Sequence, residues 1–178
     1  MEIKYLLFAF IFPIIVFSQE KQNSFFSIQT GFLGVWVNNE TTIKDSFVLK
    51  SEIGLDTGLF GGNEITNFVL YPNISLQPKY YYNFKKRNEK GLNTNFNSGN
   101  FIGLKLKYNP NWFTISNVDN ISIAENISII PKWGIKRNYF KHLAIELGGG
   151  VGYRKYLIKQ SNSGEVAVDL LLRIGYIF

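Results

Sequence analysis

The chain has 178 residues, of which 16% are aromatic and only 18% charged, with no cysteine, one histidine and a formal net charge of +6. This length supports one domain with a substantial core. The lack of cysteine excludes disulfides, thiolate zinc sites, a catalytic thiol and a lipoprotein anchor, and a single histidine excludes most multi-histidine metal sites. We therefore expect no metal site and no cofactor.

The first 18 residues have the pattern of a secretory signal peptide. Lys4 precedes an apolar run from Tyr5 to Phe17, which is too short for a membrane-spanning helix. Cleavage after Val16-Phe17-Ser18 would leave a mature domain of residues 19–178, and an uncleaved anchor is the alternative. Because the chain is exported and its charges are dispersed, nucleic acid is not expected as a partner.

In the mature chain, apolar and polar residues alternate, which is typical of strands with two different environments. In chain order, the alternating segments are 24–43, 47–56, 66–84, 101–108, 121–137, 142–158 and 164–178. The clearest is 121–137. One face of that segment carries Ile121, Ile123, Ile127, Ile129, Pro131, Trp133 and Ile135.

The segment 24–43 changes phase along its length. Phe26 and Ile28 are at even positions, whereas Val35 is at an odd position. Two short strands that meet near Thr30-Gly31 would explain this change and would give eight strands in total. A β-bulge within one longer strand is the alternative.

Alternation alone fits either a soluble β-sandwich or a membrane β-barrel, and the polar face distinguishes them. This face mixes glycines with charges of both signs, as the crowded interior of a small barrel requires. Strands of about ten residues are also long enough to cross a bilayer at a tilt. Because an unpaired buried charge is costly, we expect the interior charges to form a paired network. Its predicted members are Lys50, Glu52, Lys105, Lys107, Glu146, Arg154, Asp169 and Arg173.

Aromatic residues gather near the ends of these segments, where a barrel would place them at the two headgroup levels of the bilayer. They are Tyr80, Tyr82, Phe84, Trp112, Phe113, Trp133, Tyr139, Phe140, Tyr176 and Phe178. Aromatic residues in the core of a soluble domain would be the alternative explanation.

The segment 164–178 ends on an aromatic residue, with apolar residues at every second position before it. This pattern resembles the C-terminal strand of bacterial outer-membrane β-barrel proteins, and the chain is similar in size to the small barrels of the OmpA/OmpX type. The resemblance implies a closed, antiparallel, up-and-down barrel in contact with outer-membrane lipid. It also implies that the barrel-assembly machinery reads the last strand during insertion. The residues that match this signal are Leu172, Ile174, Tyr176 and Phe178.

Counting strands back from a periplasmic C-terminus places residues 85–100 in the periplasm, where barrel turns are normally short. This segment is long and basic. Either the topology is inverted here or the segment binds a partner, and a solvated, mobile loop is the plainer alternative. The basic residues that would bind a partner are Lys85, Lys86, Arg87 and Lys90.

We expect no enzymatic site. The sequence His142-Leu143-Ala144 lacks the His-x-Ser arrangement of the outer-membrane barrels that hydrolyse or acylate lipid A. Glu52, Glu146 and Asp169 are better explained as ion-pair partners than as acid–base groups.

The sequence thus favours a non-enzymatic, integral outer-membrane barrel that is structural or an accessory subunit of a larger outer-membrane complex. An eight-stranded barrel is filled by its own side chains, which argues against a general porin. A narrow pore for small anionic solutes is the first alternative. A lipid A-modifying barrel enzyme and a soluble, secreted sandwich or lipocalin-like binder are the others.

Overall fold

The computed structural model describes residues 24–61, 67–157 and 164–178, so the predicted signal peptide, residues 1–18, lies outside the described residues. The described fold is all-β, as predicted. Its helical elements are one short helix, α2 (Phe84–Glu89), and one 3₁₀ turn, η2 (Asn95–Asn97). Among the described residues, no helix is long and apolar enough to cross a membrane.

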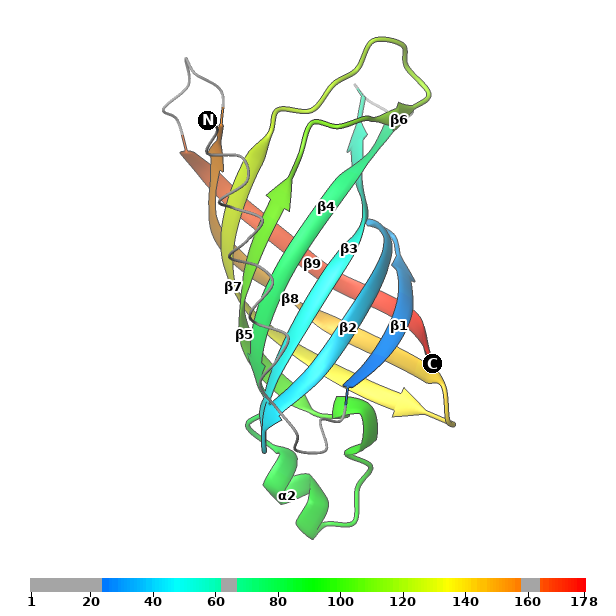
Figure 1. The fold of residues 1–178 in the computed structure, drawn as a ribbon, viewed down its shortest axis with the longest axis vertical. Coiled ribbons are helices and arrows are strands. Elements are labelled where there is room, and N and C mark those ends of the chain that lie inside the picture. Colours follow the sequence, from blue (N-terminus) through cyan, green and yellow to red (C-terminus); the bar gives the residue numbers. More distant parts are fainter. Residues whose placement is uncertain (1–23, 62–66, 158–163) are drawn as a thin grey trace, which may run out of the picture.

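The described strands form a single antiparallel sheet whose hydrogen bonding closes into a ring (Figure 1). Eight strands pair in chain order around the ring, and the last returns to the first; the two-residue β6 pairs with β4 alone. The strands are β1 (Ser24–Gly31), β2 (Gly34–Lys44), β3 (Phe47–Phe60), β4 (Asn67–Tyr80), β5 (Asn100–Asn109), β6 (Ile115–Ser116), β7 (Asn126–Tyr139), β8 (Leu143–Tyr156) and β9 (Gly164–Ile177).

Two details of the predicted strands can be compared with this sheet. The segment 24–43 contains two strands with a turn at 32–33, as its change of phase predicted. The prediction of a strand from residue 121 was wrong, because β7 begins at Asn126. Residues 117–125 are rich in turn-forming side chains, and Asn120 adopts a left-handed φ of 58°, which interrupts extended structure. The nine described strands are one more than expected, the additional one being β6.

The two ends of the ring differ (Figure 1). At one end lie α2, the tight turn at 45–46, the turn at 140–142 and the C-terminal residue Phe178; we call this the α2 end. At the other end lie β6 and the long connection between β5 and β7, and we call this the β6 end.

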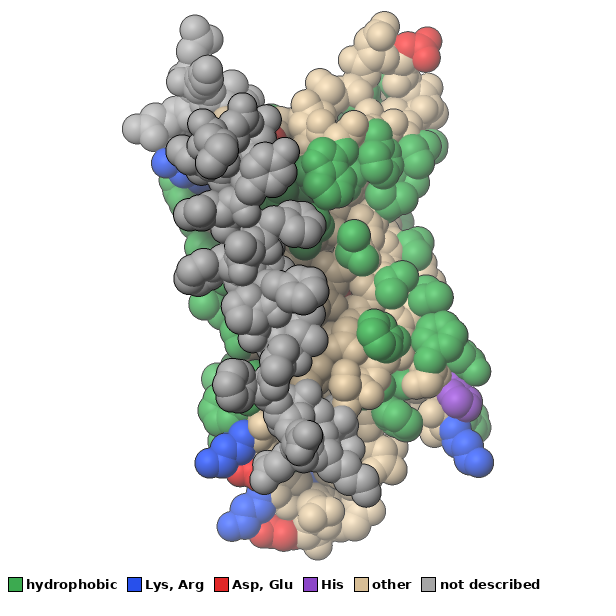
Figure 2. All heavy atoms as spheres, viewed as in Figure 1, with side chains coloured by type: hydrophobic (Ala, Val, Ile, Leu, Met, Phe, Trp, Pro, Cys, Tyr) green, Lys and Arg blue, Asp and Glu red, His purple; other side chains and the backbone are tan. Residues whose placement is uncertain are grey.

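Apolar side chains face outward from the ring, and polar side chains face inward. In β7, for example, Ser128, Lys132 and Lys136 are buried, whereas Ile129 and Trp133 are about half exposed. Figure 2 shows apolar side chains spread over the outer surface of the strands. This distribution reverses the arrangement of ordinary water-soluble domains, in which apolar side chains fill the centre.

Candidate functional site

The interior of the ring holds a network of ion pairs, which we call the interior network. Among the described residues it contains seven basic and five acidic side chains, each at most 10% exposed. Strand alternation places all of them on inward-facing positions. They are Lys50, Lys79, Lys105, Lys107, Lys132, Lys136, Arg173, Glu40, Glu52, Asp56, Glu146 and Asp169.

Near the α2 end, the network joins side chains from five strands. Glu40 lies between two lysines, with Oε1 3.3 Å from Lys79 Nζ and Oε2 2.9 Å from Lys136 Nζ. Lys79 Nζ also contacts Glu146 Oε1 at 2.5 Å. The other oxygen of Glu146 is 3.1 Å from Lys50 Nζ. Each buried carboxylate here therefore has at least two cationic partners, which offsets its loss of hydration.

Farther into the ring, Glu52 is the central acidic group. Its carboxylate forms ion pairs with Lys50 at 3.4 Å, with Lys105 at 3.1 Å and with the guanidinium of Arg173. Lys105 Nζ in turn lies 3.3 Å from Asp169 Oδ2, which a lysine of β7 also contacts at 3.0 Å. The ion pairs therefore form one connected chain along the interior.

Trp36 links this chain to the interior toward the β6 end. Its ring stacks under the guanidinium of Arg173, 3.5 Å from the ring centroid, and its Nε1–H donates to Asp56 Oδ1 at 2.9 Å. Asp56 also pairs with Lys107 at 2.8 Å. Gly54 provides the room, because a Cβ at this position would lie 2.7 Å from the Trp36 ring.

Residues 81–99 fold over the α2 end, and we call this segment the end cap. The buried ring of Tyr81 stacks on Phe84 with centroids 4.5 Å apart. Asn97, also buried, donates its Nδ2–H to Glu40 Oε2 at 2.8 Å. The end cap is thereby hydrogen-bonded directly to the interior network.

Backbone contacts hold the rest of the end cap against β7. The N–H of Lys136 donates to the Gly99 carbonyl at 2.8 Å. The side-chain amide of Asn138 donates to the carbonyls of Asn95 and Phe96 at 2.6 and 2.8 Å. These contacts fix part of the end cap to the ring, while its lysines stay exposed to solvent.

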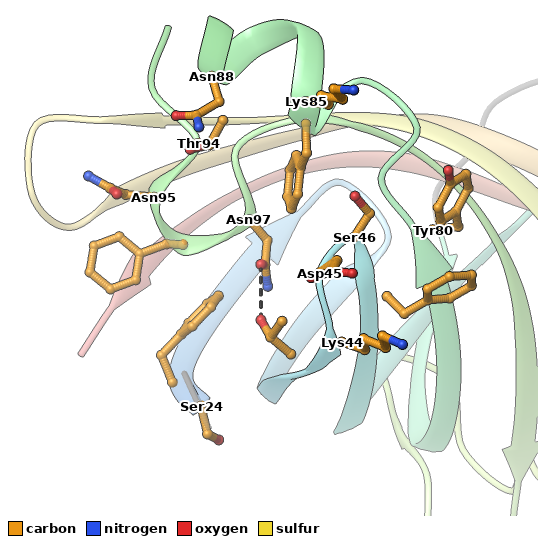
Figure 3. Close-up of a pocket in the computed structure, with 15 residues that line it drawn as sticks. Ser24, Lys44, Asp45, Ser46, Tyr80, Lys85, Asn88, Thr94, Asn95 and Asn97 are labelled. Carbon is orange, nitrogen blue, oxygen red and sulfur yellow. Dashed lines mark hydrogen bonds between the residues drawn. The ribbon is translucent and has the colours of Figure 1, made fainter. Parts of the chain in front are cut away.

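A groove of about 1240 Å³ lies between the end cap and the nearby strand ends (Figure 3). The Thr42 hydroxyl donates to Asn97 Oδ1 at 3.5 Å, and the dashed line from Asn97 in Figure 3 marks this contact. The aromatic side chains that line the groove are Phe25, Phe47, Tyr80, Phe84 and Phe96, and its polar side chains include Ser24, Lys44, Asp45, Ser46, Lys85, Asn88, Thr94 and Asn95.

Seven of the eight charges predicted for a paired interior lie in the interior network. The exception is Arg154, which pairs with Glu165 near the ends of β8 and β9, where the carboxylate is 47% exposed. Sequence reasoning did not select the other members, although each lies on the polar face of an alternating segment. The members that it missed are Glu40, Asp56, Lys79, Lys132 and Lys136.

The other predicted residues lie on the outside of the ring. Leu172, Ile174, Tyr176 and Phe178 are all exposed on its outer surface. In the end cap, Lys85, Lys86 and Lys90 are exposed and form no ion pair with any described residue, whereas Arg87 donates to the Asn93 carbonyl at 2.8 Å.

The single histidine is part of a turn contact. His142 Nδ1 donates to the Ile177 carbonyl at 2.7 Å, and its ring stacks on Tyr176 with centroids 5.0 Å apart. These contacts hold the turn between β7 and β8 against the last strand.

The arrangement as a whole is that of a filled, charge-paired interior. Basic and acidic groups contact each other directly, and their small exposure shows that little water reaches them. The sequence matches no protein-family model and no curated protein sequence.

Proposed function

We propose that this protein is an integral outer-membrane β-barrel that is closed to solutes and acts as a structural or accessory subunit of a larger outer-membrane complex. The observation that carries the proposal is the reversed distribution of side chains around a closed ring. Charges buried inside and apolar groups exposed outside suit a lipid solvent. The hydrogen bonds between the strands satisfy most of the backbone without water.

The aromatic side chains support the same environment. Phe47 and Tyr80 pack together near the α2 end with ring centroids 4.8 Å apart. Nearby, the indole N–H of Trp133 donates to the Tyr82 hydroxyl at 2.9 Å. Exposed aromatic rings with polar tips are favoured at the headgroup level, so the α2 end has the character of a membrane interface.

The interior network favours a closed barrel over a narrow anion pore. The lysines that could attract anions are already paired with carboxylates, as in the contact of Lys79 with Glu146. The end cap adds a second obstruction at the α2 end, because Asn97 and Tyr81 are buried there. Opening a path would require buried ion pairs to separate, which is strongly unfavourable.

The accessory role rests on the exposed surface of the end cap. Lys85, Lys86 and Lys90 present three positive charges without an ion-pair partner among the described residues. They lie beside a groove that is lined by both aromatic and polar side chains. An acidic surface of a neighbouring protein would complement this end of the barrel.

Fractionation of expressing cells, followed by SDS gel electrophoresis with and without boiling, tests the membrane assignment. We expect recovery in the outer membrane and a band that shifts on heating. A soluble protein with no shift would overturn the assignment and favour the secreted binder.

Planar-bilayer recordings test the closed state, and we expect no conductance from the purified protein. Steady anion-selective channels would instead support the alternative function, a narrow pore for small anionic solutes. Mass spectra of lipid A from overexpressing cells should be unchanged. A modified lipid A species would instead support the alternative of a lipid A-modifying enzyme.

A further inference from the structure

The strand β9 has one edge that is only partly paired. Its residues Gly164–Tyr176 all pair with β8, whereas only Arg173–Ile177 pair with β1. The cause is the shortness of the first hairpin, since β1 ends at Gly31, opposite Arg173. Figure 1 shows the turn between β1 and β2 well below the level that β3 and β4 reach at the β6 end.

The direction of the free backbone groups follows from strand alternation. The N–H of Ile177 donates to the His142 carbonyl on the β8 side, and the N–H of Phe178 donates to the Phe26 carbonyl on the β1 side. Even-numbered residues of β9 therefore direct their N–H and C=O toward β1. At Val166, Val168 and Leu170 these groups have no strand partner among the described residues.

The free edge is also apolar and unusually exposed. The side chains of Val166, Val168 and Leu170 are 70%, 59% and 63% exposed, whereas Ile129, in a strand paired on both sides, is 43% exposed. The turn beneath the edge reads Gly31-Phe-Leu-Gly34, and Phe32 is 73% exposed. An apolar turn suits lipid contact, and in the proposed membrane location this part of the ring would lie at the depth of the hydrocarbon.

Unpaired backbone groups at that depth need a partner, because hydrocarbon offers no hydrogen bonds. Lipid acyl chains have no donors or acceptors for these backbone groups. An extended polypeptide presents N–H and C=O groups at the spacing of a strand, and it adds to a free edge in the same way as a natural neighbour. The chemistry of the edge therefore selects a protein strand with apolar side chains.

If the signal peptide is removed as predicted, the remaining start of the chain cannot provide that strand. Residues 19–23 span at most about 18 Å when fully extended. The free edge begins beyond Gly31, about 23 Å along β1 from Ser24 at the rise of a strand. The predicted mature N-terminus is therefore too short to reach Val168.

A second copy of the chain is also a poor partner. Two barrels inserted in the same direction are related by an axis along the membrane normal. Their β9 strands would then both run toward the α2 end but tilt in opposite directions, so the two edges would cross instead of pairing. The partner must therefore be a different chain.

We propose that the free edge of β9, Val166–Leu170, binds an extended apolar segment of another membrane protein by strand addition. This inference rests on the proposed membrane location and identifies a lateral docking site for the accessory subunit. The site is distinct from the basic end cap, which faces the aqueous phase at the α2 end.

A spin-label experiment tests the site, because the chain contains no cysteine. Leu170→Cys places a nitroxide beside the edge, and Ile129→Cys provides a control on the outer face of β7, which is paired on both sides. Collision with oxygen is measured in native outer-membrane vesicles and in vesicles of extracted outer-membrane lipid that contain only the purified protein. We expect at least a threefold lower collision rate at position 170 in native membranes alone, with no difference at position 129.

Val168→Pro tests whether backbone pairing causes this protection. Proline removes an N–H that β8 does not use, and edge strands tolerate it on their free side. In a Leu170→Cys background, the variant should keep the heat-dependent band shift and lose the protection. If the variant does not fold, the collision rates at position 170 in native and reconstituted membranes still test whether another protein covers the edge.

Each other outcome overturns the inference. Protection in lipid vesicles that contain only this protein would show that lipid covers the edge. Dipolar coupling between labels there would show a second copy, and equal oxygen access at both positions in native membranes would show an unoccupied edge. None of these results would alter the outer-membrane fractionation or the band shift, so failure of the docking site is distinguishable from failure of the membrane assignment.

Discussion

Asn97 donates a hydrogen bond to Glu40 at 2.8 Å and thereby joins the end cap to a carboxylate that also holds two lysines. Since Asn97 has a φ of 60°, glycine can replace it without backbone strain. Asn97→Gly should loosen the end cap by about 1–3 kcal/mol, because Glu40 loses a buried donor. Trypsin cleavage after Lys85, Lys86 and Lys90 should then be between roughly fivefold and a hundredfold faster, since about 1.4 kcal/mol is a factor of ten.

Asn120→Gly is the matched control, because Asn120 has a similar φ of 58° but lies in the connection at the opposite end of the ring. Its cleavage pattern within the end cap should equal that of the parent protein. Equal cleavage of the Asn97→Gly protein would show that the hydrogen bond does not hold the end cap.

Glu146→Gln should destabilise the folded ring strongly. Glu146 is buried between Lys50 and Lys79, and the substitution removes the charge that both lysines share. Breaking a buried ion pair by changing one partner typically costs about 3–5 kcal/mol. The free energy of unfolding in urea, followed through the heat-dependent band shift, measures this loss.

Glu165→Gln provides the comparison. Glu165 also accepts a hydrogen bond from a cationic side chain, that of Arg154, but the side chain of Glu165 is 47% exposed. Its substitution should cost about 0–1 kcal/mol, as is usual for surface pairs. Similar losses for Glu146→Gln and Glu165→Gln would mean that water reaches the interior network.

Gly54→Ala should destabilise the contact between Trp36 and Arg173. The added methyl group would lie 2.7 Å from the Trp36 ring and 2.2 Å from the Val35 carbonyl oxygen. Overpacking of this kind costs about 1–3 kcal/mol. Gly149→Ala is the control, because its Cβ would lie 3.3 Å from the nearest atom, the Asp169 carbonyl oxygen. Tryptophan emission and the midpoint of urea unfolding should change for the first variant and remain nearly unchanged for the second.

Phe178→Ser should lower the amount of protein that assembles in the outer membrane, because it removes the terminal aromatic group of the proposed assembly signal. Phe140→Ser removes an aromatic side chain that is 93% exposed in the nearby turn and should not affect assembly. The fraction of outer-membrane protein with the heat-dependent shift is the measurement. Equal assembly of both variants would show that Phe178 is not part of the assembly signal.

The period of the sequence was sufficient to predict the interior position of seven members of the interior network. Lys105, Lys107 and Asp169 alternate with apolar residues, and a two-residue period leaves them no other face. The same reasoning separated β1 from β2, since Phe26 and Val35 could not face outward from one regular strand.

The pairing of the interior charges could not be read from that period. Lys79 and Glu146 are 67 residues apart, and their contact depends on the register of every strand between them. The two partners of Glu40 could not be read from the period for the same reason, because they come from β4 and β7 on other parts of the ring. The end cap was missed because left-handed residues such as Phe96 and Asn97 shape it, and these leave no periodic signal.

The short joint between β1 and β9 also has a kinetic consequence. It connects the first and the last described strands, so the ring closes only after both have been delivered, and such long-range closure is slow. It has five residue pairs, as many as the joint between β4 and β5 and far fewer than the thirteen between β8 and β9. Local opening requires the least free energy where the fewest backbone hydrogen bonds must break. The joint that forms last is therefore also one of the two at which the folded ring opens most readily.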